Sequence, residues 1–372
     1  MTQIVICANN IDELGGAQRV VHLLADGFHR RGHEVTAVGV TPYEPAHPMP
    51  GGFDRRVLMP DVWPKKSAQT ERIRANLRAT AVSQLVELLR TKGHEPGVII
   101  TAQVWSMEIL ADALAVLNPA ARARWKVIGQ YHGSFAAAAS GRDLARVQRS
   151  YQDVSIFTAL SVEDAVAFTA AGLRNMRSMP NPLAFWPAQP AELSSDEPTL
   201  TYLGRLSQEK GVDLLIDAWS LLADRHPTWR LRIVGDGPMA DRLREQAALL
   251  AGMERIDWDS PTVDPASVLL TSDLVVLPSR TEGLPLVIAE AQGCGVPVVA
   301  TDCSSGVRQL IGDWGRLAPR GDSRALAEVL DEAMADPAWR AESGRRARVE
   351  MQPYRLDAVM NAWEKLLGQV LR

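Results

Sequence analysis

Short apolar runs alternate with longer segments of helical periodicity along this 372-residue chain, and this alternation constrains the fold more than any other feature. The runs QIVICAN from Gln3 and HEVTAVGV from His33 flank a segment in which Val20, Leu24 and Phe28 recur at helical spacing. Such a pattern predicts parallel strands that are joined by crossover helices. We therefore expect an α/β protein.

The alternation runs twice, with a proline-rich stretch between the two passes. Residues 180–198 hold five prolines, which favour turns or extended chain. The pattern then restarts with the strand candidates TLTYLG, WRLRIVG, RIDW, DLVVLPS and VPVVATD. Because the chain exceeds the size at which one core keeps growing, two domains are expected. We predict a Rossmann-like domain at 1–182, a linker at 183–198, a second Rossmann-like domain at 199–352 and a helix at 353–372 that crosses back to the first domain.

Composition narrows the class of protein. A net charge of −4 lacks the positive field of a nucleic-acid-binding protein. The only cysteines are Cys7, Cys294 and Cys303, an odd number without metal-ligand spacing, which argues against both a disulfide framework and structural zinc. No run reaches the roughly 18–20 apolar residues that span a bilayer, and no basic leader opens the sequence. We expect a cytoplasmic protein whose membrane contact is at most peripheral.

Functional residues are expected in loops that follow strands, because ligands of doubly wound sheets bind beyond the carboxyl ends of the strands. The loop NNIDELGGAQ follows the first strand, and its Gly15 and Gly16 would let backbone N–H groups and a positive helix end approach a phosphate. A plain tight turn explains the two glycines equally well. The loop does not match GxGxxG, so a dehydrogenase is disfavoured.

Two cations stand in the loop GRLSQEKG, directly after the strand TLTYL. Arg205 offers a planar fork of donors and Lys210 a mobile point charge, so together they could clamp a diphosphate and neutralise a leaving group. Two solvated surface cations are the alternative interpretation of this pair.

Two carboxylates mark a third loop, SRTEGLPLVIAEAQGCGVP. Glu282 and Glu290 are separated by seven residues, and the apolar spacing predicts a helix that opens near Pro285. This places Glu282 on the loop before the positive helix end and Glu290 about one turn inside the helix. The two carboxylates can therefore contact different parts of one extended ligand.

The segments GRLSQEKG, IVGDGP at 233–238 and EGLPLVIAE, in this order, resemble family 4 of the retaining glycosyltransferases, and the resemblance covers most of the chain. It implies the GT-B fold, with a nucleotide-sugar donor in a cleft between two doubly wound domains. It also implies that Arg205 and Lys210 bind the donor diphosphate, that Glu290 binds the ribose hydroxyls and that Glu282 holds the transferred sugar.

The same resemblance implies further donor contacts from both domains. The additional positions are Gly15, Gly16, Gly235, Gly283, Leu284, Pro285 and Leu286. His132, after the strand WKVIGQY, matches a position that faces the donor sugar near the reacting carbon, although a lone histidine is usually structural. Catalysis by a front-face displacement would need no protein nucleophile, no metal and no cofactor besides the donor, and would rest on Glu282, His132, Arg205 and Lys210.

The donor's identity is predicted from one short segment. TDCSSGVRQLI resembles a variant found in family members that use UDP-hexoses or UDP-N-acetylhexosamines, although Gln309 replaces the usual acid. We expect a UDP-sugar rather than a GDP-sugar, and a glycan, a lipid-linked saccharide or a polyol phosphate as acceptor. A catalytically silent nucleotide-sugar-binding protein, a partner subunit and a nucleotide-sugar epimerase remain alternatives.

One segment is strongly basic although the whole chain is not. Residues 55–92 contain nine Lys or Arg against three acids, a local charge of +6. This basic segment could touch an anionic membrane surface, placing the protein at the inner face of the cytoplasmic membrane. A helix with one core face and one solvated face is the alternative. The cations are Arg55, Arg56, Lys65, Lys66, Arg72, Arg74, Arg78, Arg90 and Lys92.

Overall fold

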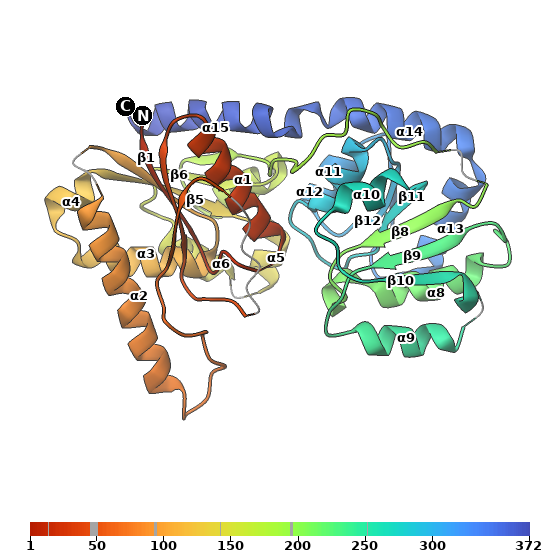
Figure 1. Ribbon diagram of the computed structural model, residues 1–372, viewed down its shortest axis with the longest axis horizontal. Helices are drawn as coiled ribbons and strands as arrows, with labels where there is room; N and C mark the ends of the chain where they lie inside the picture. The colour runs from red at the N-terminus through yellow and green to blue at the C-terminus, as the bar shows by residue number, and fades with distance from the viewer. Residues whose placement is uncertain (14, 45–50, 93–94, 142, 194–195, 251) are drawn as a thin grey trace. The chain divides into compact units, whose positions relative to one another are not determined.

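The computed structural model describes residues 1–13, 15–44, 51–92, 95–141, 143–193, 196–250 and 252–372. Its chain divides into two compact units, Met1–Pro182 with Leu356–Arg372, and Leu183–Arg355. Each unit is a parallel sheet with helices packed on it (Figure 1). The predicted α/β fold with two doubly wound sheets is confirmed.

In the first unit the described strands form one sheet in the order β3-β2-β1-β4-β5-β6-β7. The strands are β1 (Gln3–Ala8), β2 (Glu34–Gly39), β3 (Asp54–Val57), β4 (Gly97–Thr101), β5 (Trp125–Tyr131), β6 (Ile156–Ala159) and β7 (Met176–Ser178). The helices are α1 (Gly16–Arg30), α2 (Glu71–Thr91), α3 (Val104–Val116), α4 (Pro119–Ala123), α5 (Phe135–Ser140), α6 (Asp143–Ser150), α7 (Val162–Ala170) and α15 (Leu356–Val370).

The central strands of this unit are apolar along nearly their whole length because helices cover both faces of the sheet. Every residue of β4 and β6 is buried, and Phe157 and Phe168 form the centre of an aromatic cluster with ring centroids 5.4 Å apart. The edge strands β3 and β7 are short and carry exposed polar residues. Their lack of an apolar run explains why sequence patterning missed them.

The C-terminal helix α15 belongs to the first unit, as predicted, and packs against α1 (Figure 1). The fully buried rings of Phe28 and Trp363 meet edge-on at 6.1 Å. A Cβ at Gly27 would lie 2.7 Å from the sulfur of Met360, so the missing side chain lets the two helices approach closely.

The second unit repeats the architecture, with the described strands in the order β10-β9-β8-β11-β12-β13. The strands are β8 (Thr199–Leu203), β9 (Arg230–Val234), β10 (Ile256–Asp259), β11 (Leu274–Leu277), β12 (Val298–Thr301) and β13 (Arg316–Ala318). The helices are α8 (Val212–Leu222), α9 (Ala240–Ala248), α10 (Pro265–Leu270), α11 (Leu286–Gly293), α12 (Ser305–Ile311), α13 (Ser323–Ala335) and α14 (Pro337–Glu350), with single 3-10 turns η1 (Gln208–Lys210), η2 (Met253–Arg255) and η3 (Gln352–Tyr354).

The described residues of the predicted linker, 183–193 and 196–198, lie within the second unit, and 194–195 are outside the described residues. Arg348 of α14 holds this segment: its guanidinium donates hydrogen bonds to the carbonyl oxygens of Gly293 and Pro187 and lies 4.6 Å from the ring centroid of Trp186. The backbone N–H of Ala191 also donates to Cys294 at 2.8 Å. These contacts fasten the proline-rich stretch, whose described residues form no helix and no strand apart from an isolated bridge at Leu183.

Candidate functional site

The predicted residues of the second unit gather at one edge of its sheet. Arg205 and Lys210 follow β8, Gly235 follows β9, and Glu282 follows β11. These three strands are neighbours in the sheet and run parallel, so the loops at their carboxyl ends lie beside one another. This edge is where ligands of doubly wound sheets bind.

Lys210 and Glu282 form an ion pair, although 72 positions separate them in the sequence. The Lys210 Nζ lies 2.7 Å from Oε1 of Glu282, and the two side chains are 27% and 9% exposed. The hydroxyl of the fully buried Ser279 donates to the same Oε1, also at 2.7 Å. The cation predicted to bind a diphosphate thus contacts the carboxylate predicted to hold a sugar.

A second ion pair joins the same two loops. The Arg280 guanidinium donates to both carboxylate oxygens of Asp213, at 2.7 and 2.6 Å, and to the Gln208 carbonyl at 2.9 Å. Burial acts to raise the pKa of Asp213, but the hydrogen bond and charge of Arg280 outweigh it, so this pKa lies below its ordinary value. Asp213 therefore remains a carboxylate at neutral pH.

Glycine is required where the β8 and β9 loops meet. Gly235 has φ +146°, and a Cβ there would lie 1.9 Å from the Gly204 carbonyl oxygen. A Cβ at Gly237 would lie 2.4 Å from the Leu206 carbonyl oxygen. The backbone of the IVGDGP segment therefore packs directly on the backbone of the GRLSQEKG segment, which explains the glycines without reference to a ligand.

Helix α11 begins at Leu286, one residue after Pro285, and among the described residues no side chain is found to cap its N-terminus. As expected from the seven-residue spacing, Glu290 lies one turn inside the helix. Its side chain is buried, with 2% of the residue exposed. The Gly283 carbonyl accepts a hydrogen bond from the Ser304 hydroxyl at 3.2 Å, and Leu284 is buried. The EGLPL segment is thus a tightly packed turn that leads into a helix N-terminus, a site that favours anions.

The predicted residues of the first unit follow two of its strands. Gly15 is the N-cap of α1, Gly16 is its first residue, and no side chain caps this helix end among the described residues. The Gln18 amide donates to Asn10 and Glu13, both at 3.3 Å, and its oxygen lies 2.3 Å from where a Cβ of Gly15 would be. Packing of Gln18 is therefore a structural reason for glycine at position 15.

His132 follows β5 directly. Burial lowers its pKa from 6.5 to about 4, so the imidazole is neutral at physiological pH. Its Nε2 is buried and makes no hydrogen bond to any described residue. The Nδ1 atoms of His22 and His33 are likewise buried without a hydrogen bond to a described residue, so this feature alone does not distinguish His132 from a structural histidine.

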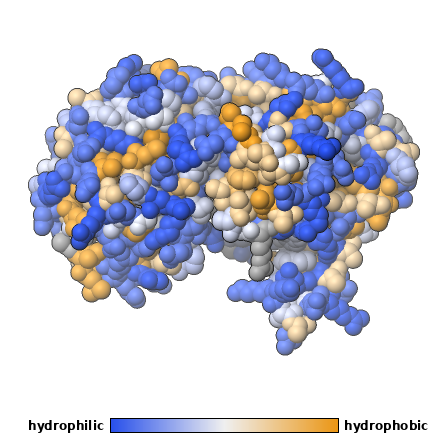
Figure 2. All heavy atoms as spheres, turned by 180° about the vertical axis from the view of Figure 1, so that it is seen from behind, coloured by the Kyte–Doolittle hydropathy of each residue, from blue (hydrophilic) through white to orange (hydrophobic). Residues whose placement is uncertain are grey.

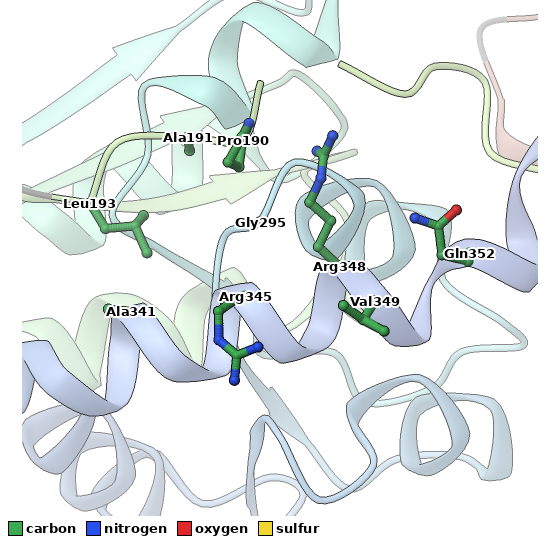
Figure 3. A pocket seen from close by; sticks show the side chains of 9 residues that line it. All are labelled: Pro190, Ala191, Leu193, Gly295, Ala341, Arg345, Arg348, Val349 and Gln352. Atoms are coloured by element: carbon green, nitrogen blue, oxygen red, sulfur yellow. The ribbon is translucent and has the colours of Figure 1, made fainter. Parts of the chain in front are cut away.

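A cavity in the second unit is lined by other residues (Figure 3). It has a volume of about 520 Å³, and Pro190, Ala191 and Leu193 of the proline-rich stretch face Arg345 and Arg348 of α14 across it. None of the predicted site residues lines it. Because Arg348 is engaged by two carbonyls and Trp186, we interpret this cavity as a by-product of fastening the proline-rich stretch.

The described part of the chain shows neither a cluster of metal-binding side chains nor a membrane-spanning helix. No cluster of three or more His, Cys, Asp or Glu side chains is arranged to hold a metal ion. No described helix combines the length and hydropathy needed to cross a membrane.

Sequence reasoning missed three residues that shape the site: Ser279, Arg280 and Asp213. Ser279 and Arg280 stand in the same loop as Glu282, so their position was visible, but the direction of their side chains was not. Asp213 lies three residues after Lys210 and pairs with a residue 67 positions away. Only the tertiary structure reveals this pairing.

Two parallel doubly wound units, with cations and carboxylates at the carboxyl edge of the second sheet, define the GT-B class of glycosyltransferases. A family model described as Glycosyltransferase Family 4 matches residues 14–183, and one described as Glycosyl transferases group 1 matches residues 187–350. The chain therefore belongs to glycosyltransferase family 4.

Relatives and solved structures agree with this assignment. An uncharacterized glycosyltransferase of Haemophilus influenzae is 26% identical over 376 residues, which cover 99% of this chain and 100% of the relative. The amylovoran biosynthesis glycosyltransferase AmsD of Erwinia amylovora is 24% identical, with coverages of 99% and 100%.

The fold is shared with HepE from Anabaena in complex with UDP and glucose, with a TM-score of 0.78, 20% identity and coverages of 99% and 100%. It is also shared with the sucrose-phosphate synthase of Thermosynechococcus elongatus, with a TM-score of 0.82, 18% identity and coverages of 99% for both chains.

Proposed function

We propose that this glycosyltransferase moves a hexose or an N-acetylhexosamine, with retention of configuration, from a UDP-sugar to a hydroxyl of a glycan, lipid-linked or polyol-phosphate acceptor. A GDP-sugar is the second candidate for the donor. The observation that carries the proposal is the Lys210–Glu282 ion pair at the carboxyl edge of the second sheet. The complex of HepE with UDP and glucose supports UDP as the nucleotide of the donor, and the role of AmsD in amylovoran biosynthesis supports a glycan acceptor.

In the proposed reaction, Lys210 and Arg205 neutralise the charge that develops on the leaving diphosphate. Lys210 must leave Glu282 to do so, and the carboxylate so released accepts hydrogen bonds from the hydroxyls of the sugar. Glu290 binds the ribose, while Gly235 and the backbone of 283–286 line the nucleotide and sugar. From the first unit, Gly15 and Gly16 approach the diphosphate, and His132 approaches the sugar as a neutral donor or acceptor.

The proposed chemistry uses neither a metal nor a protein nucleophile. Two cationic side chains supply the positive charge, and the leaving phosphate helps to remove the proton of the acceptor hydroxyl. Transfer is therefore expected to persist in excess EDTA. Loss of activity that added Mg²⁺ or Mn²⁺ restores would contradict this part of the proposal.

The first test is release of UDP or GDP from a panel of nucleotide sugars. Replacing Lys210 by alanine should lower the rate at least about 100-fold, because one missing preorganised donor to a developing negative charge costs on this order. Lys92→Ala is a matched control: Lys92 forms an ion pair of similar length, 2.8 Å, with Glu34, the first residue of β2 in the first unit. Its activity should equal that of the wild type.

The outcomes separate the alternatives. Selective, Lys210-dependent release fixes the donor and supports a transferase. A product sugar with altered ring stereochemistry would identify an epimerase instead. Donor binding without turnover, even with a panel of acceptors, would identify a silent nucleotide-sugar-binding protein or a partner subunit.

We also propose a cytoplasmic location, with peripheral membrane contact narrowed to one end of α2. Five of the nine cations of the basic segment form ion pairs with carboxylates. Four of these five carboxylates lie outside residues 55–92. Arg74 lies 4.5 Å from the centroid of the Trp63 ring. The cations that remain exposed near the N-terminus of α2 are Lys65, Lys66 and Arg72. Figure 2 shows mainly hydrophilic residues at this end of the helix.

Binding to vesicles that contain phosphatidylglycerol tests this contact. Replacing Lys65, Lys66 and Arg72 together by alanine should weaken binding on the order of 100-fold, at about 1 kcal/mol per cation near an anionic surface. The control removes the same charge from cations that are already paired, Arg56, Arg90 and Lys92. If both triple variants weaken binding equally, net charge rather than this end of α2 is responsible; if the wild type does not bind, the membrane contact is wrong.

A further inference from the structure

Arg280 forms hydrogen bonds to the backbone of the loop that carries Lys210. The Arg280 side chain donates to the Gln208 carbonyl at 2.9 Å, and its backbone N–H donates to the Glu209 carbonyl at 2.7 Å. Gln208 and Glu209 are the first two residues of the 3-10 turn η1, whose third residue is Lys210. Arg280 therefore binds two successive carbonyls of the turn that positions the catalytic cation.

The carboxylate of Asp213 completes the arrangement. It accepts two hydrogen bonds from the Arg280 guanidinium, at 2.7 and 2.6 Å, in the bidentate geometry that gives the strongest and most directional pairs. The two side chains are 29% and 27% exposed, so solvent screens the pair only in part. Asp213 lies in the first turn of α8, a regular element that serves as an anchor.

Close backbone packing shows that the two loops are fitted to each other. Gly211, directly after Lys210, has φ +66°, and a Cβ there would lie 2.1 Å from the carbonyl oxygen of Pro278, two residues before Arg280. The Lys210–Glu282 ion pair is a further contact between the same two loops. The predicted diphosphate-binding turn is thus held between Pro278, Arg280 and Glu282.

We infer that Arg280 and Asp213 are a positioning pair, which holds the turn 208–210 so that Lys210 can pass from Glu282 to the donor diphosphate without the loop moving. The inference rests on the proposed function and assigns roles to two residues that the family resemblance did not supply. Arg280 is not itself the diphosphate ligand, because Asp213 matches its charge and its fork is directed at Asp213 and Gln208. Its effect on the donor passes through Lys210.

The test measures the affinity of UDP and GDP for the wild type, Arg280→Ala, Arg280→Lys and Asp213→Ala, and for the double variant, with a melting curve for each protein. Arg280→Ala should raise the Kd of the preferred nucleotide roughly tenfold, the size of coupling that contacting residues show. Arg280→Lys keeps the charge but loses the planar fork, so its Kd should be intermediate. The double variant should be no weaker than Arg280→Ala, because the two residues act as a unit.

Arg230→Ala is the matched control. Arg230 makes a bidentate pair with Asp257, at 2.8 and 2.6 Å, in the same unit and with exposures of 36% and 44%. It joins β9 to β10 and touches none of the predicted residues. Its loss should lower the melting temperature without changing the Kd by more than about twofold, the level at which distant sites are independent.

Four results would overturn the inference. If Arg280→Ala binds the nucleotide as tightly as the wild type, the pair does not position the turn. If Arg230→Ala weakens binding as much as Arg280→Ala does, the effect is one of general stability. If the double variant is weaker than Arg280→Ala by the full effect of Asp213→Ala, the residues act separately. A wild type that binds neither UDP nor GDP refutes the proposed function itself and, with it, the inference.

Discussion

Ser279 offers the sharpest single-atom test of the site. Its hydroxyl donates to Oε1 of Glu282 at 2.7 Å, and Lys210 is the other side chain that donates to this oxygen among the described residues. In the proposed reaction Lys210 turns to the diphosphate, and the Ser279 hydroxyl is expected to keep the Glu282 carboxylate in place. Ser279→Ala removes this hydrogen bond and leaves the backbone and neighbouring packing intact.

The expected magnitude follows from the burial of the two groups. Ser279 is fully buried and the Glu282 side chain is 9% exposed, so water does not readily replace the lost hydroxyl. A hydrogen bond to a charged group contributes about 1.5–3 kcal/mol, which corresponds to a fall of roughly 10- to 100-fold in kcat/KM. The assay is the initial rate of transfer or donor hydrolysis across a range of donor concentrations.

The free nucleoside diphosphate separates Ser279 from the diphosphate-binding turn. UDP lacks the sugar that Glu282 is proposed to hold, so Ser279→Ala should leave the Kd of UDP unchanged, whereas Arg280→Ala should raise it. Ser272→Ala controls for stability, because this hydroxyl is also buried and donates a hydrogen bond to Thr201 at 2.7 Å. Ser272 precedes β11, whereas Ser279 follows it. Wild-type kcat/KM in Ser279→Ala, or an equal loss in Ser272→Ala, would refute the reasoning.

Two further predictions concern other parts of the molecule. Because burial lowers the pKa of His132 from 6.5 to about 4, the unfolded chain binds more protons between these values, and the free energy of unfolding should fall as the pH drops from about 6.5 to about 4. His132→Gln should flatten this fall in chemical denaturation series; an unchanged slope would contradict the burial of the ring. Gly235→Ala should lower stability by at least about 3 kcal/mol, through strain and a backbone clash. At Gly321, which has φ +81° and open space around it, the same substitution should cost only about 1–2 kcal/mol; equal losses would show that strain, not the clash, dominates.

The fold was predictable because both sheets are buried on two faces. Strands such as β4 and β11 are continuous apolar runs, and the helices between them have clear spacing. The ends of α7 follow the usual capping rules: the Ser161 side chain accepts a hydrogen bond from the Asp164 N–H at 3.0 Å, and Gly172 follows the helix with φ +93°. The short edge strands β3 and β7 escaped because an edge position does not require apolar side chains.

The site was predictable only in part. Motif order located Arg205, Lys210 and Glu282, since residue type and the end of a strand are both visible in the sequence. The sequence does not show which of several neighbouring charges meet. Arg280 and Lys210 are both cations near carboxylates, yet one is engaged by Asp213 and the other pairs with the residue proposed to hold the sugar.

The basic segment shows the same limit from the other direction. Counting charges along residues 55–92 gives +6, but the fold brings Asp12, Glu34 and Asp112 to Arg55, Lys92 and Arg78. A cation that already faces a carboxylate adds little to the field felt by a membrane, because the two opposite charges largely cancel at distances greater than their own separation. Within residues 55–92, attraction to an anionic surface must therefore come from the exposed cations for which no carboxylate partner is found among the described residues, and these lie near the N-terminus of α2. The vesicle experiment thus decides between a local contact and a segment whose charge the fold itself neutralises.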